Sequence, residues 1–258
     1  MALANVALSK RLDLLKFLAI LAKNLSFLAR ICKFNAPQQK RHFSKMRKNL
    51  KKSGEKMQRQ IITYPDKRLF ERSLKVQNFD ANLHALLDDM YETMINGNGI
   101  GLAAIQVAEP LRIFLANLPD ENDEIKKENL LEFINPELEF IGTEKILCNE
   151  GCLSVPNFFE EVERYKSVRV HYQDRFGKAQ SLEASDLLAV VLQHEFEHLN
   201  GHLFIERLSY SQKKLFEKEF KAAQKAKKSG KTLNSGVAKA QSAPKAPLKD
   251  RIRPKESK

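Results

Sequence analysis

Cysteine is scarce in this chain of 258 residues, which contains only Cys32, Cys148 and Cys152. Three thiols are too few for a disulfide framework, and this excludes the small, disulfide-rich class of secreted proteins. The chain is long enough to bury a sizeable core without such cross-links. We therefore expect a reducing compartment, with the cytoplasm as the default location.

Long apolar runs are lacking as well. The most apolar stretch, residues 12–34, is interrupted by Lys16, Lys23 and Arg30, whereas a membrane-spanning helix needs about 20 mostly apolar residues. We therefore expect no transmembrane segment. The regular spacing of the three basic residues is typical of a basic amphipathic helix. Residues 1–56 fit three interpretations: a transit peptide to an organelle, a cytoplasmic extension, or a stretch preceding a true start at Met57.

Acidic residues are few at both ends of the chain. The net charge is +12 over residues 1–58 and +10 over residues 221–258, but −10 over residues 59–220. The basic character therefore belongs to two terminal segments, and we expect no DNA partner. This pattern predicts a basic extension (1–58), a folded domain (59–220) and a basic, disordered tail (221–258).

Hydrophobic periodicity predicts an α+β fold. Helices are expected over residues 79–95, begun by Asp80 and ended by Gly97, over 185–201, begun by Ser185 and ended by Gly201, and over 211–228. Short, mostly antiparallel strands are expected at residues 61–64, 111–118 and 145–148, with a strand end at 134–136 and strands on both sides of a turn at 175–177. In this fold the strands surround the helix at 185–201, and the other two helices flank it.

The segment QHEFEHLNG, residues 193–201, contains the pattern HExxH. His194 and His198 are one helical turn apart, so both imidazoles face the same side and can reach one divalent ion. Glu195 projects away from them, close enough to accept a proton from a water on that ion. The pattern also arises by chance in helices whose histidines merely pack, so it does not establish a metal site by itself.

The third ligand has three candidate positions. The long motif HExxHxxGxxH requires a third histidine where this chain has Phe204, which excludes that class of metallopeptidase. Glu217 or Glu219 would complete a peptidase site with a glutamate ligand. Cys152, in the segment EGCLSVP, offers a thiolate suited to Fe²⁺ or Zn²⁺. Cys148 is better explained as a small buried strand residue.

Glycines also mark the segment GIGLAAIQV, residues 99–107. The pattern GxGxxG for dinucleotides fails, because Ala104 stands at the position of its third glycine. Gly99 and Gly101 instead allow the backbone to pass close to a ligand. The amide of Gln106 is suited to donating a hydrogen bond to a developing oxyanion.

In this order, GIGLAAIQ, EGCLS and QHExxH resemble the three signature motifs of the peptide deformylases. The resemblance covers about residues 61–220. It implies removal of the N-terminal formyl group from formyl-methionine of nascent chains, with formate as product. It also implies that Glu195 is general base and acid, and that Gln106 and the backbone N–H of Leu153 stabilise the oxyanion. The implied metal ligands are Cys152, His194 and His198.

The resemblance further implies one divalent ion per chain, with water on that ion as nucleophile. The family most often uses Fe²⁺, and the same ligands accept Zn²⁺, Ni²⁺ or Co²⁺. The substrate backbone is expected to lie along the glycine segments, and Val190 and Leu187, one and two turns before His194, are candidates to line a pocket for methionine. The backbone candidates are Gly99, Ile100, Gly101 and Gly151.

The chain departs from the family at Glu197, where HExDH has Asp; we expect a supporting or surface role there. The basic tail suits a contact with ribosomal RNA, but it has no aromatic residue after Phe220 to stack on bases, which favours a merely solvated tail. We expect a monomer. A non-catalytic ribosome- or RNA-binding protein built on a decayed enzyme is disfavoured, because every ligand position is intact.

Overall fold

The computed structural model describes residues 57–120, 122, 124–228 and 252–254. The predictions for the basic extension, and for most of the basic tail, lie outside the described residues. Within the described part, no helix is long and apolar enough to cross a membrane.

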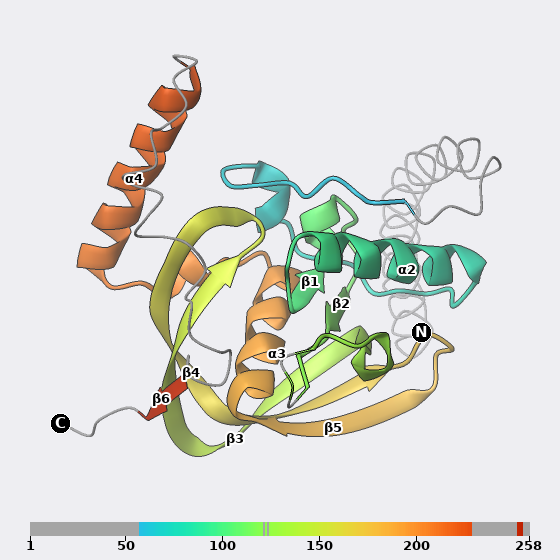
Figure 1. Ribbon diagram of the computed structural model, residues 1–258. Helices are drawn as coiled ribbons and strands as arrows, with labels where there is room; N and C mark the ends of the chain where they lie inside the picture. The colour runs from blue at the N-terminus through green and yellow to red at the C-terminus, as the bar shows by residue number, and fades with distance from the viewer. Residues whose placement is uncertain (1–56, 121, 123, 229–251, 255–258) are drawn as a thin grey trace, which may run out of the picture. The chain divides into compact units, whose positions relative to one another are not determined.

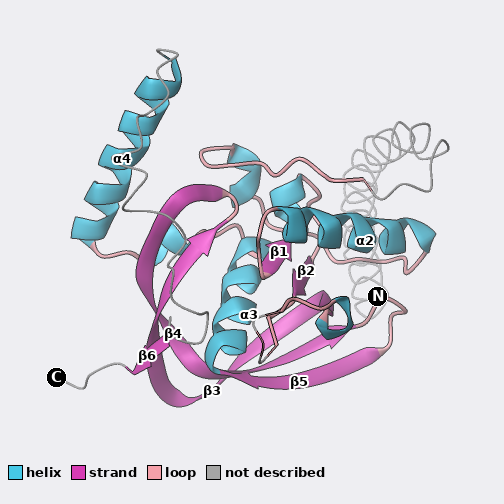
Figure 2. Ribbon diagram, viewed as in Figure 1, coloured by secondary structure: helices cyan, strands magenta, loops and turns pink. Residues whose placement is uncertain are grey.

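One antiparallel sheet organises the described chain (Figures 1 and 2). Its strands are β1 (Gly101–Ala103), β2 (Ile113–Ala116), β3 (Leu131–Cys152), β4 (Val155–Gln173), β5 (Ala179–Ser185) and β6 (Ile252–Pro254). The first five are neighbours in sequence order, and β6 pairs with β3. The prediction of an α+β fold with antiparallel strands is therefore confirmed.

The prediction that the strands are short is wrong for β3 and β4, which have 22 and 19 residues. The strand end expected at 134–136 and the separate strand at 145–148 both lie within β3. Its register against β4 shifts between Ile134 and Glu137, and Asn135 takes a left-handed φ of 53°. This bulge lets the strand continue through Pro136, which has no N–H to donate to a ladder.

The strand predicted at residues 61–64 is also wrong. The N–H of Ile62 donates to the carbonyl of Gln106 over 2.8 Å, and that of Tyr64 donates to the carbonyl of Ser154, also over 2.8 Å. Two single bonds to different parts of the chain anchor this segment but do not form a ladder.

The predicted helices are confirmed as α2 (Ala81–Asn96), α3 (Asp186–Leu199) and α4 (Tyr210–Lys228). Asp80 caps α2 through its carboxylate, which accepts from two backbone N–H groups. Ser185 occupies the N-cap position of α3, but its side chain makes no capping bond. Gly201 has a φ of +79° just after α3, a conformation that favours glycine. The short 3-10 helices are η2 (Lys67–Phe70), η3 (Ala104–Val107), η4 (Lys127–Asn129) and η5 (Phe204–Arg207).

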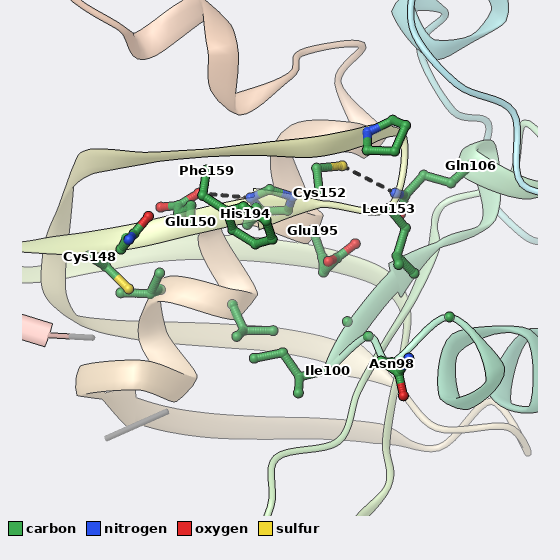
Figure 3. Close-up of a pocket in the computed structure, with 18 of the residues that line it drawn as sticks. Asn98, Ile100, Gln106, Cys148, Glu150, Cys152, Leu153, Phe159, His194 and Glu195 are labelled. Carbon is green, nitrogen blue, oxygen red and sulfur yellow. Dashed lines mark hydrogen bonds and ion pairs between the residues drawn. The ribbon is translucent and has the colours of Figure 1, made fainter. Parts of the chain in front are cut away.

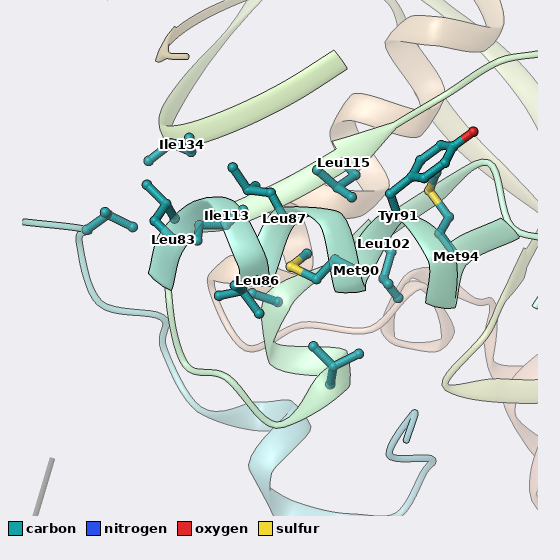
Figure 4. Close-up of a cluster of buried hydrophobic side chains, with 13 residues drawn as sticks. Leu83, Leu86, Leu87, Met90, Tyr91, Met94, Leu102, Ile113, Leu115 and Ile134 are labelled. Carbon is teal, nitrogen blue, oxygen red and sulfur yellow. The ribbon is translucent and has the colours of Figure 1, made fainter. Parts of the chain in front are cut away.

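Two apolar clusters hold the helices on the sheet. The apolar stripe of α2 packs against β1 and β2, with Leu87, Met90 and Met94 fully buried (Figure 4). Helix α3 buries Ala189 and Leu192 against side chains of β2, β3 and β4. The sheet and α3 thereby fix the position of the histidine pattern.

Candidate active site

One thiol and two imidazoles converge between the end of β3 and the helix α3. Figure 3 shows two of these side chains, Cys152 and His194. The potential ligand atoms of Cys152, His194 and His198 all lie within 4.8 Å of one another. Cys152 Sγ is 3.3 Å from His198 Nε2. One soft sulfur and two borderline nitrogens form a donor set that fits a divalent transition-metal ion.

The local structure explains this convergence. His194 and His198 face the same side of α3 because they are four residues apart. Cys152 ends β3 and pairs with Val155, the first residue of β4, so the connection between the strands is tight. The N–H of Ser154 in this turn lies 3.4 Å from the Cys152 sulfur, to which it donates.

The orientation of His194 is fixed from behind by Glu150. His194 Nδ1 and Glu150 Oε2 are 2.8 Å apart, which leaves the other ring nitrogen for the site. Arg164 in turn donates to both oxygens of Glu150, from Nε over 2.6 Å and from Nη2 over 2.8 Å. Burial alone would raise the pKa of Glu150, but the charge and hydrogen bonds of Arg164 lower it to about 2.

Sequence reasoning missed both Glu150 and the buried position of Arg164. The Arg164 side chain is fully buried and also donates to Glu197 Oε1 over 2.7 Å. Glu197 accepts a further bond from Arg207 and is not part of the ligand cluster. This agrees with the supporting or surface role expected for Glu197.

Burial tunes the charged groups of the site. It raises the pKa of Glu195 to about 7, so that this carboxyl can both take up and release a proton near neutral pH. Burial, followed by the charge of His194, lowers the pKa of His198 and favours its neutral form, the form that binds metals. For His194 burial acts in the same direction, but Cys152 and Glu150 outweigh it and raise the pKa above its ordinary value.

Gln106, from η3, lies on the other side of the sulfur. Its Nε2 is 3.5 Å from Cys152 Sγ and 3.2 Å from Ser154 Oγ, and its Oε1 accepts from the N–H of Ala103 over 2.8 Å. The side chain is buried, so the direction of its amide donor is fixed.

Comparison with known proteins identifies the family. The family model described as polypeptide deformylase matches residues 58–214. A peptide deformylase of Campylobacter jejuni is 61% identical over 169 residues, covering 66% of this chain and 97% of that protein. This chain belongs to the polypeptide deformylase family. The members of that family are hydrolases that act on formyl-methionyl peptides.

Solved deformylase structures have the same fold. A crystal structure from Legionella pneumophila is 36% identical with a TM-score of 0.59, covering 65% of this chain and 98% of that one. A deformylase of Acinetobacter baumannii with Met-Ala-Ser bound is 31% identical with a TM-score of 0.56, covering 60% of this chain and all of that one.

The three deformylase motifs surround one cavity of about 480 Å³. This volume falls within the range of about 300–1,000 Å³ that is usual for ligand pockets. Predicted site residues from all three motifs line it: Gly99, Ile100, Gly101, Gln106, Gly151, Cys152, Leu153, Leu187, Val190, His194 and Glu195. Cys148 also lines this cavity, yet it is not part of the ligand cluster.

The glycines allow this close packing. A Cβ on Gly101 would lie 2.9 Å from Glu195 Cδ, and one on Gly99 would lie 2.8 Å from Leu153 Cδ1. A larger residue at position 101 would therefore displace the carboxyl. The glutamates of the peptidase interpretation, Glu217 and Glu219, lie on α4; within the described residues neither joins the ligand cluster.

Proposed function

We propose that this protein removes the formyl group from the N-terminal formyl-methionine of newly made chains, with a divalent ion held by Cys152, His194 and His198. The observation that carries the proposal is the convergence of these three ligand atoms beside the buried carboxyl of Glu195. Fe²⁺ is the ion we favour, because the family most often uses it. Zn²⁺, Ni²⁺ and Co²⁺ are possible substitutes, since this donor set accepts all four ions.

Such an ion would lower the pKa of a water molecule and polarise the formyl oxygen. Glu195 takes a proton from the attacking water, whose oxygen adds to the formyl carbon. Glu195 then gives this proton to the methionine nitrogen as the C–N bond breaks, so that formate and a free amine leave. Two features support this role: a pKa of about 7, and a buried Oε2 without a partner among the described residues.

Two donors beside the cavity are suited to stabilising the oxyanion. We assign this role to Gln106 Nε2 and to the backbone N–H of Leu153, because both residues line the cavity. Gln106 is held by Ala103 and buried, so its donor needs no reorientation during the reaction.

The methionine side chain is assigned to the apolar part of the cavity. Leu187 and Val190 lie on α3 at successive turns before His194 and line this cavity, as does Cys148. The substrate backbone is assigned to the two glycine-containing walls, which comprise Gly99, Ile100, Gly101 and Gly151.

Release of formate from formyl-Met-Ala-Ser tests the proposal, with protein purified without oxygen. Cys152→Ala is expected to lose both bound metal and activity, whereas Glu195→Ala loses activity but keeps the metal. Glu217→Ala is the matched control, because it removes a candidate ligand of the peptidase interpretation that lies outside the ligand cluster, and it is expected to keep both. Metal retained by Cys152→Ala, or full activity of Glu195→Ala, would refute the assigned roles.

We propose that the protein acts as a monomer in the cytoplasm, or in an organelle if residues 1–56 are a transit peptide. Contact of the basic tail with ribosomal RNA is the alternative to the merely solvated tail that we favour. Binding to purified ribosomes at increasing salt would test it, since phosphate contacts weaken with salt.

A further inference from the structure

The second edge of β3 carries a strand from the end of the chain. Ile146 pairs with Arg164 of β4 and also with Pro254 of β6, so the two partners must lie on opposite edges of β3. β6 extends along this second edge only from Ile146 to Cys148. Figure 1 shows β6 in red beside β3.

The same edge leads directly to the cavity. Residues 148–152 of β3 line it, and among the described residues no strand pairs with this edge at 149–152. Cys148 therefore lies at the far end of the cavity and is also the last residue of β3 that pairs with β6. Cys152 lies at the other end of this stretch, in the ligand cluster (Figure 3). An unpaired edge of this kind offers backbone N–H and C=O groups to an extended chain.

The direction of β6 also matches that of a bound peptide. β6 is antiparallel to β3, with Ile252 opposite Cys148 and Pro254 opposite Ile146. A peptide whose formylated end lies beside Cys152, and which follows this edge away from the site, must also run antiparallel to β3. β6 thus has the same edge and the same direction as such a peptide.

We propose that the edge of β3 from Gly151 to Ile146 binds the backbone of the nascent chain beyond its first three residues, and that β6 occupies the far half of this edge until a long substrate displaces it. This inference rests on the proposed function. With formyl-methionine opposite Gly151, residues two and three lie opposite Glu150 and Asn149. Residues four to six then meet the positions held by β6, since each residue of a strand advances about 3.3 Å.

The chemistry of this edge suits the substrate class. Addition of a strand is governed by main-chain hydrogen bonds, so it accepts chains of any sequence. Since β6 belongs to the same chain, its competition with a substrate is independent of protein concentration. Only substrates long enough to reach Cys148 experience this competition.

The test uses the full chain and two formylated peptides, formyl-Met-Ala-Ser and the hexapeptide formyl-Met-Ala-Ser-Ala-Ser-Ala. Ile252→Pro with Arg253→Pro removes two backbone donors next to Pro254, which has none. Ile252→Val with Arg253→Lys is the matched control, because it keeps both donors. We expect the proline variant to lower KM for the hexapeptide about fivefold for each net hydrogen bond lost by β6. The kcat values for both peptides and the KM for the tripeptide should stay unchanged.

Three results would overturn the reasoning, each at a different point. Equal KM for the hexapeptide in wild type and proline variant, with the tripeptide still cleaved, refutes the displaced strand and leaves the deformylase function intact. A KM lowered equally for both peptides refutes the register, because β6 would then act on the cavity itself. No formate from the tripeptide with metal-loaded wild type refutes the function on which the inference rests.

Discussion

Replacement of Arg164 by methionine should destabilise the protein strongly. Methionine keeps much of the length of the side chain but removes three hydrogen bonds, two to Glu150 and one to Glu197. The side chain of Glu150 is only 4% exposed, so its charge would remain buried with His194 as its neighbour. Removal of one partner from a buried ion pair costs about 3–5 kcal/mol.

This cost is large for a domain of this size. A loss of 1 kcal/mol lowers the thermal midpoint by about 2–4 °C for 150–250 residues, so Arg164→Met should lower it by roughly 6–20 °C. Urea unfolding at a fixed metal concentration measures the free energy directly, and the fixed concentration matters because a bound ion adds to apparent stability.

Arg207→Met is the control, since Arg207 also bonds to Glu197 but its side chain is 49% exposed. Exposed ion pairs contribute about 0–1 kcal/mol, so little change is expected. Adding Glu150→Gln to Arg164→Met should recover part of the loss, because the uncompensated charge is then gone. Equal stability of Arg164→Met and Arg207→Met would refute the claim that the buried network, rather than the surface pair, stabilises this region.

Two further substitutions test the site and the core. Gly101→Ala should lower kcat/KM for formyl-Met-Ala-Ser about 100-fold, since its Cβ would displace the Glu195 carboxyl and a shift of about 1 Å can cost that much. Gly97→Ala should lower kcat/KM far less, because its Cβ would meet the flexible Leu153 side chain at 3.1 Å and the Thr93 carbonyl oxygen at 3.4 Å. Equal losses in the two variants would contradict this reasoning. Leu87→Ala should lower the free energy of unfolding, measured in urea, by about 2–5 kcal/mol, because this fully buried side chain fills the cluster between α2 and the sheet. A loss below about 1 kcal/mol would show that the neighbouring side chains collapse into the space that the substitution leaves.

Helix α2 shows what periodicity can predict. Its apolar positions follow the helical repeat, and its stripe from Leu83 to Met94 is buried in the structure. Asp80 and Gly97 delimit the helix as expected, because their preferences are local. The three motifs likewise indicated the cavity, since they resemble a known family in both content and order.

The middle of β3 shows what periodicity cannot predict. Residues 137–145 are exposed or half-buried on both faces, so the alternation of apolar and polar residues that marks a strand is missing there. What holds these residues extended is their pairing with β4, for example Glu139 with Arg169. Such pairing depends on a distant part of the chain, and local signals could not have revealed the length of the strand.

Arg164 is a second residue whose role depends on parts of the chain that are distant in sequence. It follows the acidic run EEVE and resembles a solvated residue, but its partners Glu150 and Glu197 lie 14 and 33 positions away. One local signal was present: Glu150 is two residues before Cys152, on the same face of β3, and so was placed to reach a ligand. Without the pairing of β3 with β4, however, nothing in the sequence brings Arg164 to that carboxylate.

The same network explains why Glu197 is compatible with an intact site. Its Oε1 accepts from the buried Arg164 and from the exposed Arg207, so the substituted position connects the interior to the surface. Two arginines and two glutamates give the network no net charge, which limits the cost of burying Arg164 and Glu150. Because Glu150 in turn orients His194, the lengthened carboxylate at position 197 acts on the ligand cluster through two intermediates and without touching it.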